Sequence, residues 1–116
     1  MQIIKRVNGG ELMLNKLELK CLIQVLRFTL RELGFEYYTR TGFDKIETEK
    51  LIYRLENGKP ADPQRFSLSL REIFNLRQNY VEVLFGITVE DFAGLFGMSK
   101  ETLMTQFKLL AEYEEN

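Results

Sequence analysis

A capped amphipathic helix occurs twice in this sequence, and this repetition limits the folds that the chain can adopt. Asn15 is followed three residues later by Glu18, and Ser69 is followed at the same spacing by Glu72. This spacing is the capping box that begins many helices. Apolar residues at helical spacing follow each capping box. They are Leu19, Leu22, Ile23, Leu26, Leu30 and Leu33 in the first stripe and Ile73, Leu76, Tyr80, Val83 and Leu84 in the second. We therefore expect two long helices.

Shorter helices are expected after each long one. Gly34 and Gly86 are predicted to end the long helices. The pattern favours further helices from about residue 44 to 56, over a short segment that includes residues 92–96, and from Ser99 onward. The strongest break follows Asn57-Gly58, where the stretch KPADPQR contains both prolines of the chain.

A few residues of the two halves match each other, and the order of predicted parts repeats. A shift of 54 residues pairs Leu14 with Leu68 and Leu30 with Leu84, and a shift of 55 pairs Gly42 with Gly97. We interpret the chain as one domain over residues 1–116, with a first repeat over about 12–57, a proline linker over 58–66 and a second repeat over about 67–113. The predicted fold class is all-α, a pseudo-twofold duplicated bundle of four or five helices.

The N-terminal residues predict a short β-hairpin before the first helix. Asn8-Gly9 separates the apolar-rich segments 3–7 and 11–14, and Asn-Gly is a strong hairpin signal. A frayed N-terminal arm is the alternative interpretation.

Composition excludes several kinds of chemistry. Among 116 residues there is no histidine, and the single cysteine, Cys21, falls inside the first predicted helix. A disulfide framework, a Cys/His zinc site and a histidine-dependent triad are therefore excluded. We predict no catalytic residue, no metal and no cofactor, and therefore no enzyme. No apolar run has the length of a membrane span, so we expect no membrane association and a cytoplasmic location.

The connector FEYYTRTGF, residues 35–43, is the first candidate for a binding surface. Tyr and Arg are enriched where proteins meet, so Tyr37, Tyr38 and Arg40 are predicted to face a partner, with Arg27 and Arg31 extending that face along the first helix. Phe35 and Phe43 are expected in the core. The leading hypothesis is a non-enzymatic protein-interaction module of adaptor, inhibitor or immunity type. Its partner is another protein or, in a homodimer, a second copy of itself.

Residues 91–108, DFAGLFGMSKETLMTQFK, carry a second pattern. A small residue, a glycine turn, a cap and an apolar stripe follow one another in Ala93, Gly97, Met98, Ser99, Leu103 and Phe107. This stretch resembles the helix-turn-helix of AraC-type regulators, which carry two such units. The resemblance implies that Lys100, Glu101, Thr102, Thr105 and Gln106 face the major groove of DNA.

DNA binding is therefore the alternative function. The net charge of −1 does not favour it, because DNA-binding proteins neutralise phosphates with basic surfaces. A DNA-binding protein should gather Lys20, Arg27 and Arg31 on the same side as Lys100 and Lys108. The two halves also resemble short bacterial proteins of no assigned function, in which a leucine-rich helix precedes an aromatic TR-x-G turn and an acidic helix. That resemblance implies a fold and a bacterial or phage origin.

Overall fold

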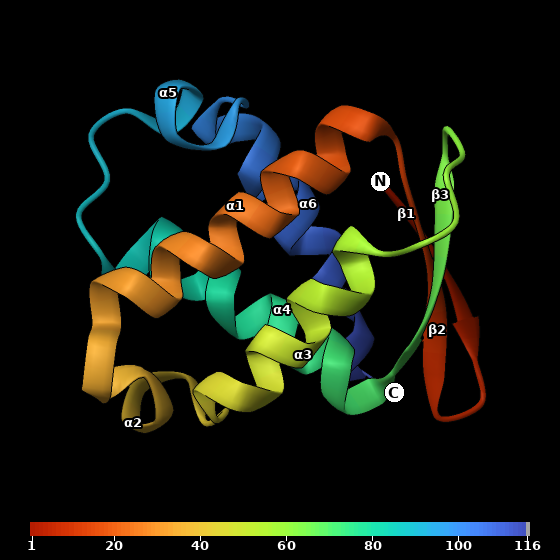
Figure 1. Ribbon diagram of the computed structural model, residues 1–116, viewed down its shortest axis with the longest axis horizontal. Helices are drawn as coiled ribbons and strands as arrows, with labels where there is room; N and C mark the ends of the chain where they lie inside the picture. The colour runs from red at the N-terminus through yellow and green to blue at the C-terminus, as the bar shows by residue number, and fades with distance from the viewer. Residues whose placement is uncertain (116) are drawn as a thin grey trace.

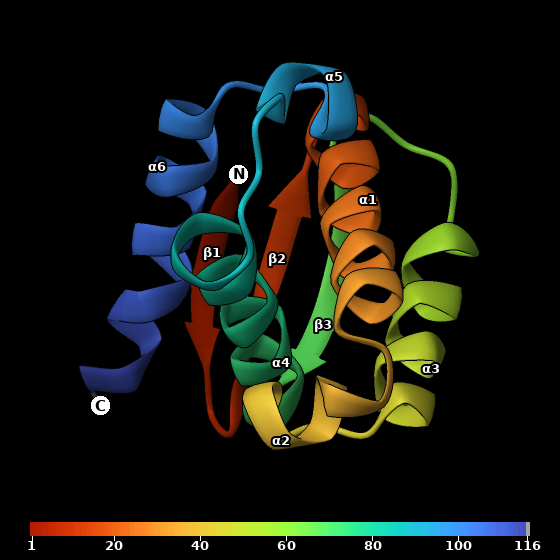
Figure 2. The same cartoon turned by 90° about the vertical axis from the view of Figure 1, so that its left-hand side faces the viewer.

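The computed structural model describes residues 1–115 as a set of helices packed against one face of a small antiparallel sheet (Figures 1 and 2). The sheet has three strands within these residues, in the order β1-β2-β3. The fold is thus mostly helical, as predicted, but the all-α class is only partly right, because the sheet includes a third strand beyond the predicted hairpin.

The predicted N-terminal hairpin is confirmed, with a different turn. Strands β1 (Gln2–Arg6) and β2 (Gly9–Leu14) pair from Gln2↔Met13 to Arg6↔Gly9, so the turn is Val7-Asn8 and not Asn8-Gly9. Asn8 adopts the left-handed conformation, with φ of 62°. Gly9 lies in the strand, where a Cβ atom would be 2.1 Å from the carbonyl oxygen of Leu68. Glycine at this position therefore permits the close approach of the next strand.

Strand β3 (Gln64–Ser69) lies in a part of the chain that we expected to be linker and the start of the second repeat. It runs antiparallel to β2, from Leu14↔Gln64 to Gly9↔Ser69. Phe66 and Leu68 alternate with exposed residues and point into the core, which is the period of a strand. The six-residue pattern is short, and the strand that pairs with it belongs to the other half of the chain. Local sequence signals therefore did not reveal it.

The first long helix begins at the predicted capping box. Helix α1 (Lys16–Leu33) starts at Asn15, whose side chain accepts a hydrogen bond from the Glu18 amide at 2.8 Å, while Glu18 accepts one from the Asn15 amide at 2.8 Å. Helix α1 is followed directly by the short helices η1 (Gly34–Glu36) and α2 (Tyr37–Thr41). Gly42, at φ of 82°, then turns the chain into α3 (Lys45–Glu56).

The second half contains a similar series of elements. Helix α4 (Leu70–Val81) starts at the Ser69 capping box and continues into the π-helical turn η2 (Glu82–Gly86). The five-residue helix α5 (Phe92–Phe96) ends at Gly97, at φ of 75°, and is followed by α6 (Lys100–Ala111) and η3 (Glu112–Glu115). Each half thus has a strand, a capped helix, a five-residue helix, a left-handed glycine and a twelve-residue helix.

Helices α1 and α4 lie at the centre of the molecule, with α3 outside α1 and α6 outside α4 (Figure 2). Their facing sides are apolar, and the inner face of the sheet closes the same core through Leu12, Leu14, Phe66 and Leu68. Fully buried residues of the two central helices include Leu22, Val25, Leu26, Ile73, Leu76 and Tyr80. The polar side of α1 is therefore directed outward between its neighbours.

The last described helix is tied to the hairpin. The Tyr113 hydroxyl lies 3.0 Å from the carbonyl oxygen of Gly9 and 3.3 Å from that of Ile4. A Cβ atom at Gly10 would lie 2.2 Å from this hydroxyl, so a larger residue there would displace the Tyr113 side chain. Residues from opposite ends of the described chain thus share one contact.

Candidate functional site

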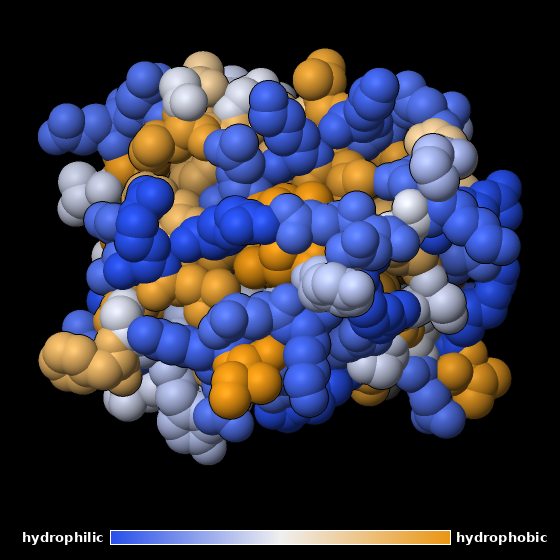
Figure 3. Space-filling model, viewed as in Figure 1, coloured by the Kyte–Doolittle hydropathy of each residue, from blue (hydrophilic) through white to orange (hydrophobic). Residues whose placement is uncertain are grey.

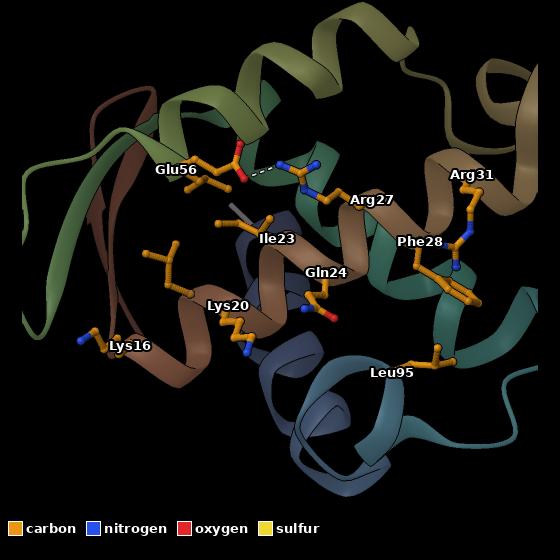
Figure 4. A pocket seen from close by; sticks show the side chains of 11 residues that line it. Lys16, Lys20, Ile23, Gln24, Arg27, Phe28, Arg31, Glu56 and Leu95 are labelled. Atoms are coloured by element: carbon orange, nitrogen blue, oxygen red, sulfur yellow. Dashed lines mark hydrogen bonds and ion pairs between the residues drawn. The ribbon is translucent and has the colours of Figure 1, made fainter.

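The outward side of α1 forms the floor of a trough between α3 and α5 (Figure 4). Residues of α1 line it at intervals of three and four, as one side of a helix must. The first hollow has a volume of about 580 Å³. It is lined by Lys16, Leu19, Lys20, Ile23, Gln24, Arg27, Phe28 and Arg31 of α1, Leu55 and Glu56 of α3, and Leu95 of α5.

A second hollow of about 660 Å³ lies between α1 and α3. It shares Arg27, Arg31 and Glu56 with the first. Its other lining residues are Leu30, Lys45, Glu49, Ile52 and Tyr53. We call the two hollows together the α1 trough.

Apolar contacts hold the walls of the trough in place. Helix α5 is attached to α1 by Phe96, whose ring meets that of Phe28 edge to face with the centroids 5.3 Å apart. On the other side, Leu55 of α3 is buried in the core. Leu19 and Ile23 are partly buried and lie on the floor. Figure 3 shows hydrophobic surface between rows of hydrophilic side chains on this face of the molecule.

An ion pair crosses the trough where the two hollows meet. Arg27 of α1 pairs with Glu56 of α3, and the dashed line in Figure 4 marks this contact. The side chains remain 56% and 40% exposed. An ion pair with this much solvent contact contributes little to stability. The ion pair therefore bridges α1 and α3 across the trough, but it can be broken at little cost in free energy.

Three further cations stand along the same helix. The Arg31 guanidinium lies over the Phe28 ring, 5.4 Å from its centroid, and 3.4 Å from the Glu32 carboxylate. Lys16 and Lys20 form no ion pair with any residue that the structure describes. The trough therefore presents a line of positive charge above an apolar floor.

The five residues predicted to bind a partner do not form one surface. Arg27 and Arg31 line the α1 trough, whereas Tyr38 and Arg40 lie on α2. Tyr38 is 61% exposed. Arg40 pairs with Glu82 at 2.5 Å, and Gly86 allows this contact because a Cβ atom there would lie 2.5 Å from the Glu82 carboxylate.

Tyr37 is fully buried and cannot face a partner, which corrects our expectation. Its hydroxyl lies 2.7 Å from Thr48 Oγ1 and donates to Asn79 Oδ1 at 3.0 Å. Burial raises the pKa of this hydroxyl above its usual value, although its hydrogen bonds act in the opposite direction. Of the two phenylalanines expected in the core, Phe43 is buried, but Phe35 is 95% exposed.

The segment that resembles a helix-turn-helix folds as two helices around Gly97, with only five residues in the first helix. Lys100, Thr102 and Thr105 are exposed on α6. Gln106 is buried and accepts a hydrogen bond from the Tyr80 hydroxyl at 2.6 Å, so it cannot reach DNA. This last position corrects the expectation drawn from the resemblance.

The basic residues in question belong to two helices. Lys20, Arg27 and Arg31 line the trough on α1, whereas Lys100 and Lys108 belong to α6. Figures 1 and 2 place α6 on the other side of the central helices from α3, the helix that forms one wall of the trough. Lys20 also lines a small hollow with Gly94 and Gly97, next to the start of α6.

Sequence reasoning missed much of the trough. Lys16, Leu19 and Ile23 recur at helical spacing with Arg27 and Arg31, and this signal could have identified one continuous side of the helix. The contributions of Glu56 and Leu95 could not be found in this way, because they depend on how α3 and α5 pack.

Side chains that could act as a nucleophile or as metal ligands are buried or lie far apart. Cys21 is fully buried, and burial raises the pKa of its thiol to about 12, so the nucleophilic thiolate is not formed near neutral pH. Within residues 1–115, no three side chains of the His, Cys, Asp and Glu types lie together as a metal site would require. No helix in that part of the chain is long and apolar enough to cross a membrane.

Comparison of the chain with protein-family models, with curated proteins and with solved structures found no match.

Proposed function

We propose that this protein is a non-enzymatic interaction module that holds a partner protein in the α1 trough. The observation that carries the proposal is the line of cations from Lys16 to Arg31 along an apolar floor, in a chain whose net charge is −1. Protein interfaces combine a hydrophobic centre with a polar rim, and this trough has both. Adaptor, inhibitor and immunity roles are all consistent with such a surface.

The arrangement of the two halves suggests that the cations serve a purpose other than folding. We propose that the halves arose by duplication. Two observations support this: their equal order of elements, and the pairing of Leu12 with Phe66, which are equivalent under the 54-residue shift. An approximate twofold axis would pass between these two residues.

Under that alignment, all four cations of α1 have apolar counterparts. Lys16, Lys20, Arg27 and Arg31 correspond to Leu70, Phe74, Val81 and Phe85. Glu56, at the 55-residue shift, corresponds to Ala111. Positions that accept apolar side chains in one half do not require charge for folding. The charges of the first half are therefore better explained by binding.

The DNA-binding alternative receives less support. Gln106 is buried, and the net charge of the chain is −1. Self-association, in which a second copy of the chain occupies the trough, is a separate alternative.

Site-specific photocrosslinking tests the proposal. A photoreactive amino acid replaces Gln24, which lies in the trough, or Thr105, which is exposed on α6 and serves as the control. In lysate from the source cells, we expect one defined protein adduct from position 24 and none from position 105. Unlabelled wild-type protein should compete for the adduct, and a Lys20→Glu variant should compete poorly.

Three outcomes would contradict the proposal in distinguishable ways. Adducts from position 105 alone would place the binding surface elsewhere. Adducts that nuclease removes would favour nucleic acid. An adduct between two copies of the chain, with a dimeric mass in solution, would assign the trough to self-association.

A further inference from the structure

We infer that the α1 trough accepts an acidic amphipathic helix of a partner protein, and that a carboxylate of this helix takes the place of Glu56 at Arg27. The inference rests on the proposed function and adds the chemistry of the partner.

The shape of the trough fits a helix. Its lining residues on α1 run from Lys16 to Arg31, which corresponds to about 22 Å of helix, or roughly four turns. Walls from α3 and α5 stand on either side of this floor. A third helix laid between two others, with its apolar side on Leu19 and Ile23, is the helix-in-groove mode of recognition.

The charge of the trough selects an acidic partner. The two hollows together are lined by five cations and two carboxylates: Lys16, Lys20, Arg27, Arg31 and Lys45, and Glu49 and Glu56. An acidic segment complements this charge and is steered toward it over a distance. Nucleic acid fits less well, because its phosphate backbone has no apolar side to place on the floor formed by Leu19 and Ile23.

The Arg27–Glu56 pair is the place where a partner carboxylate can replace a carboxylate of this chain. It joins α1 to α3 at the boundary of the two hollows, and both side chains are exposed enough to separate at little cost. If a partner carboxylate binds Arg27, Glu56 is released and the two hollows become continuous. The Glu56 carboxylate thus competes with the partner helix for Arg27.

Peptide selection followed by matched variants tests the inference. A displayed library of random peptides of about 18 residues, long enough for the trough, is selected on the wild-type protein. Binding of the enriched peptides is then measured by fluorescence anisotropy. We expect enrichment of peptides with Asp and Glu on one side and Leu or Phe on the other. Arg27→Gln should weaken their binding roughly tenfold, whereas Glu56→Gln should strengthen it severalfold.

The Arg71–Glu47 pair provides the control. It also joins an exposed arginine to a glutamate of α3, and neither residue lines the trough. Arg71→Gln and Glu47→Gln should leave peptide binding unchanged. Thermal unfolding verifies that each variant is folded. If Arg27→Gln does not fold, Lys16→Gln combined with Lys20→Gln should weaken binding in its place and reduce its salt dependence.

The outcomes separate this inference from the proposed function. Selection of neutral or basic peptides, no enrichment at all, or weaker binding by Glu56→Gln would overturn the acidic-helix inference. If photocrosslinking at position 24 still yields a protein, the interaction module stands and only the chemistry of its partner is wrong. If both experiments fail, the trough is not the binding site.

Discussion

The hydroxyl of Tyr37 joins three helices through a closed ring of hydrogen bonds. Tyr37 donates to Asn79 at 3.0 Å, Asn79 donates to the Asn75 side chain at 2.8 Å, and Asn75 donates to Thr48 at 3.1 Å. The Thr48 hydroxyl, 2.7 Å from the Tyr37 oxygen, completes the ring. All four side chains are buried. Each member therefore depends on the others for its partner.

Tyr37→Phe should lower the free energy of unfolding by about 1–3 kcal/mol, because it leaves the Asn79 carbonyl oxygen buried without its donor. Tyr38→Phe is the matched control and should have almost no effect, because the neighbouring ring is largely exposed. Urea unfolding of both variants measures the difference. Equal stability of the two would show that the ring does not contribute to stability.

At the scale of the elements, two kinds of glycine shape the fold. Gly42 ends α2 with a φ of 82°, and a Cβ atom there would meet no neighbour within 4 Å. Gly9 has no such backbone strain, but its Cβ atom would lie 2.1 Å from the backbone of β3. The first glycine relieves a conformational cost, and the second permits two strands to pair.

Gly42→Ala should therefore destabilise the protein by about 1–2 kcal/mol, the cost of a left-handed residue with a side chain. Gly9→Ala should cost more, because the strand pair β2–β3 must separate to admit the methyl group. Denaturant midpoints and backbone NMR shifts of β3 measure the two effects. A smaller loss for Gly9→Ala than for Gly42→Ala would contradict this account.

Elements that depend on nearby residues were predicted from the sequence, and those that depend on distant residues were not. Asn15 and Glu18 contact each other within one turn, so the start of α1 was predicted correctly. Strand β3 needs β2 from the other half of the chain, and it was missed. Similarly, the spacing of Arg27 and Arg31 predicted that both lie on the outward side of α1. Which residues stand beside that side depends on how α3 and α5 pack, and the sequence does not show this.

At the scale of the whole molecule, the core holds ionisable groups in their neutral forms. Burial raises the pKa of the Cys21 thiol to about 12 and the pKa of Tyr80 well above its usual value. In the unfolded chain these groups ionise at their ordinary pKa values, that of the thiol being 9.0. Unfolding in alkali thus releases protons. The contribution of these groups to the free energy of unfolding is therefore fully present below their unfolded pKa values and is lost as the pH rises above them.

The free energy of unfolding should therefore decrease from about pH 8 to about pH 10, and Cys21→Ala should make this decrease shallower. The variant removes the thiol that ionises first on unfolding. It also loses some packing, which lowers its stability by a similar amount at every pH. Urea unfolding across this pH range measures the slope. Identical slopes for the two proteins would contradict the assignment to Cys21.

The pairing of β2 with β3 has a consequence for protein synthesis. A ribosome makes β2 and α1 long before β3 and α4, whose residues cover them. Until then, the side of α1 that carries Leu22, Val25 and Leu26 has no complete core to enter, and nascent apolar surface of this kind attracts chaperones or aggregates. The contact of Tyr113 with Gly9 likewise forms only after more than a hundred further residues have been made. Translation through the second half therefore limits how early this protein can fold.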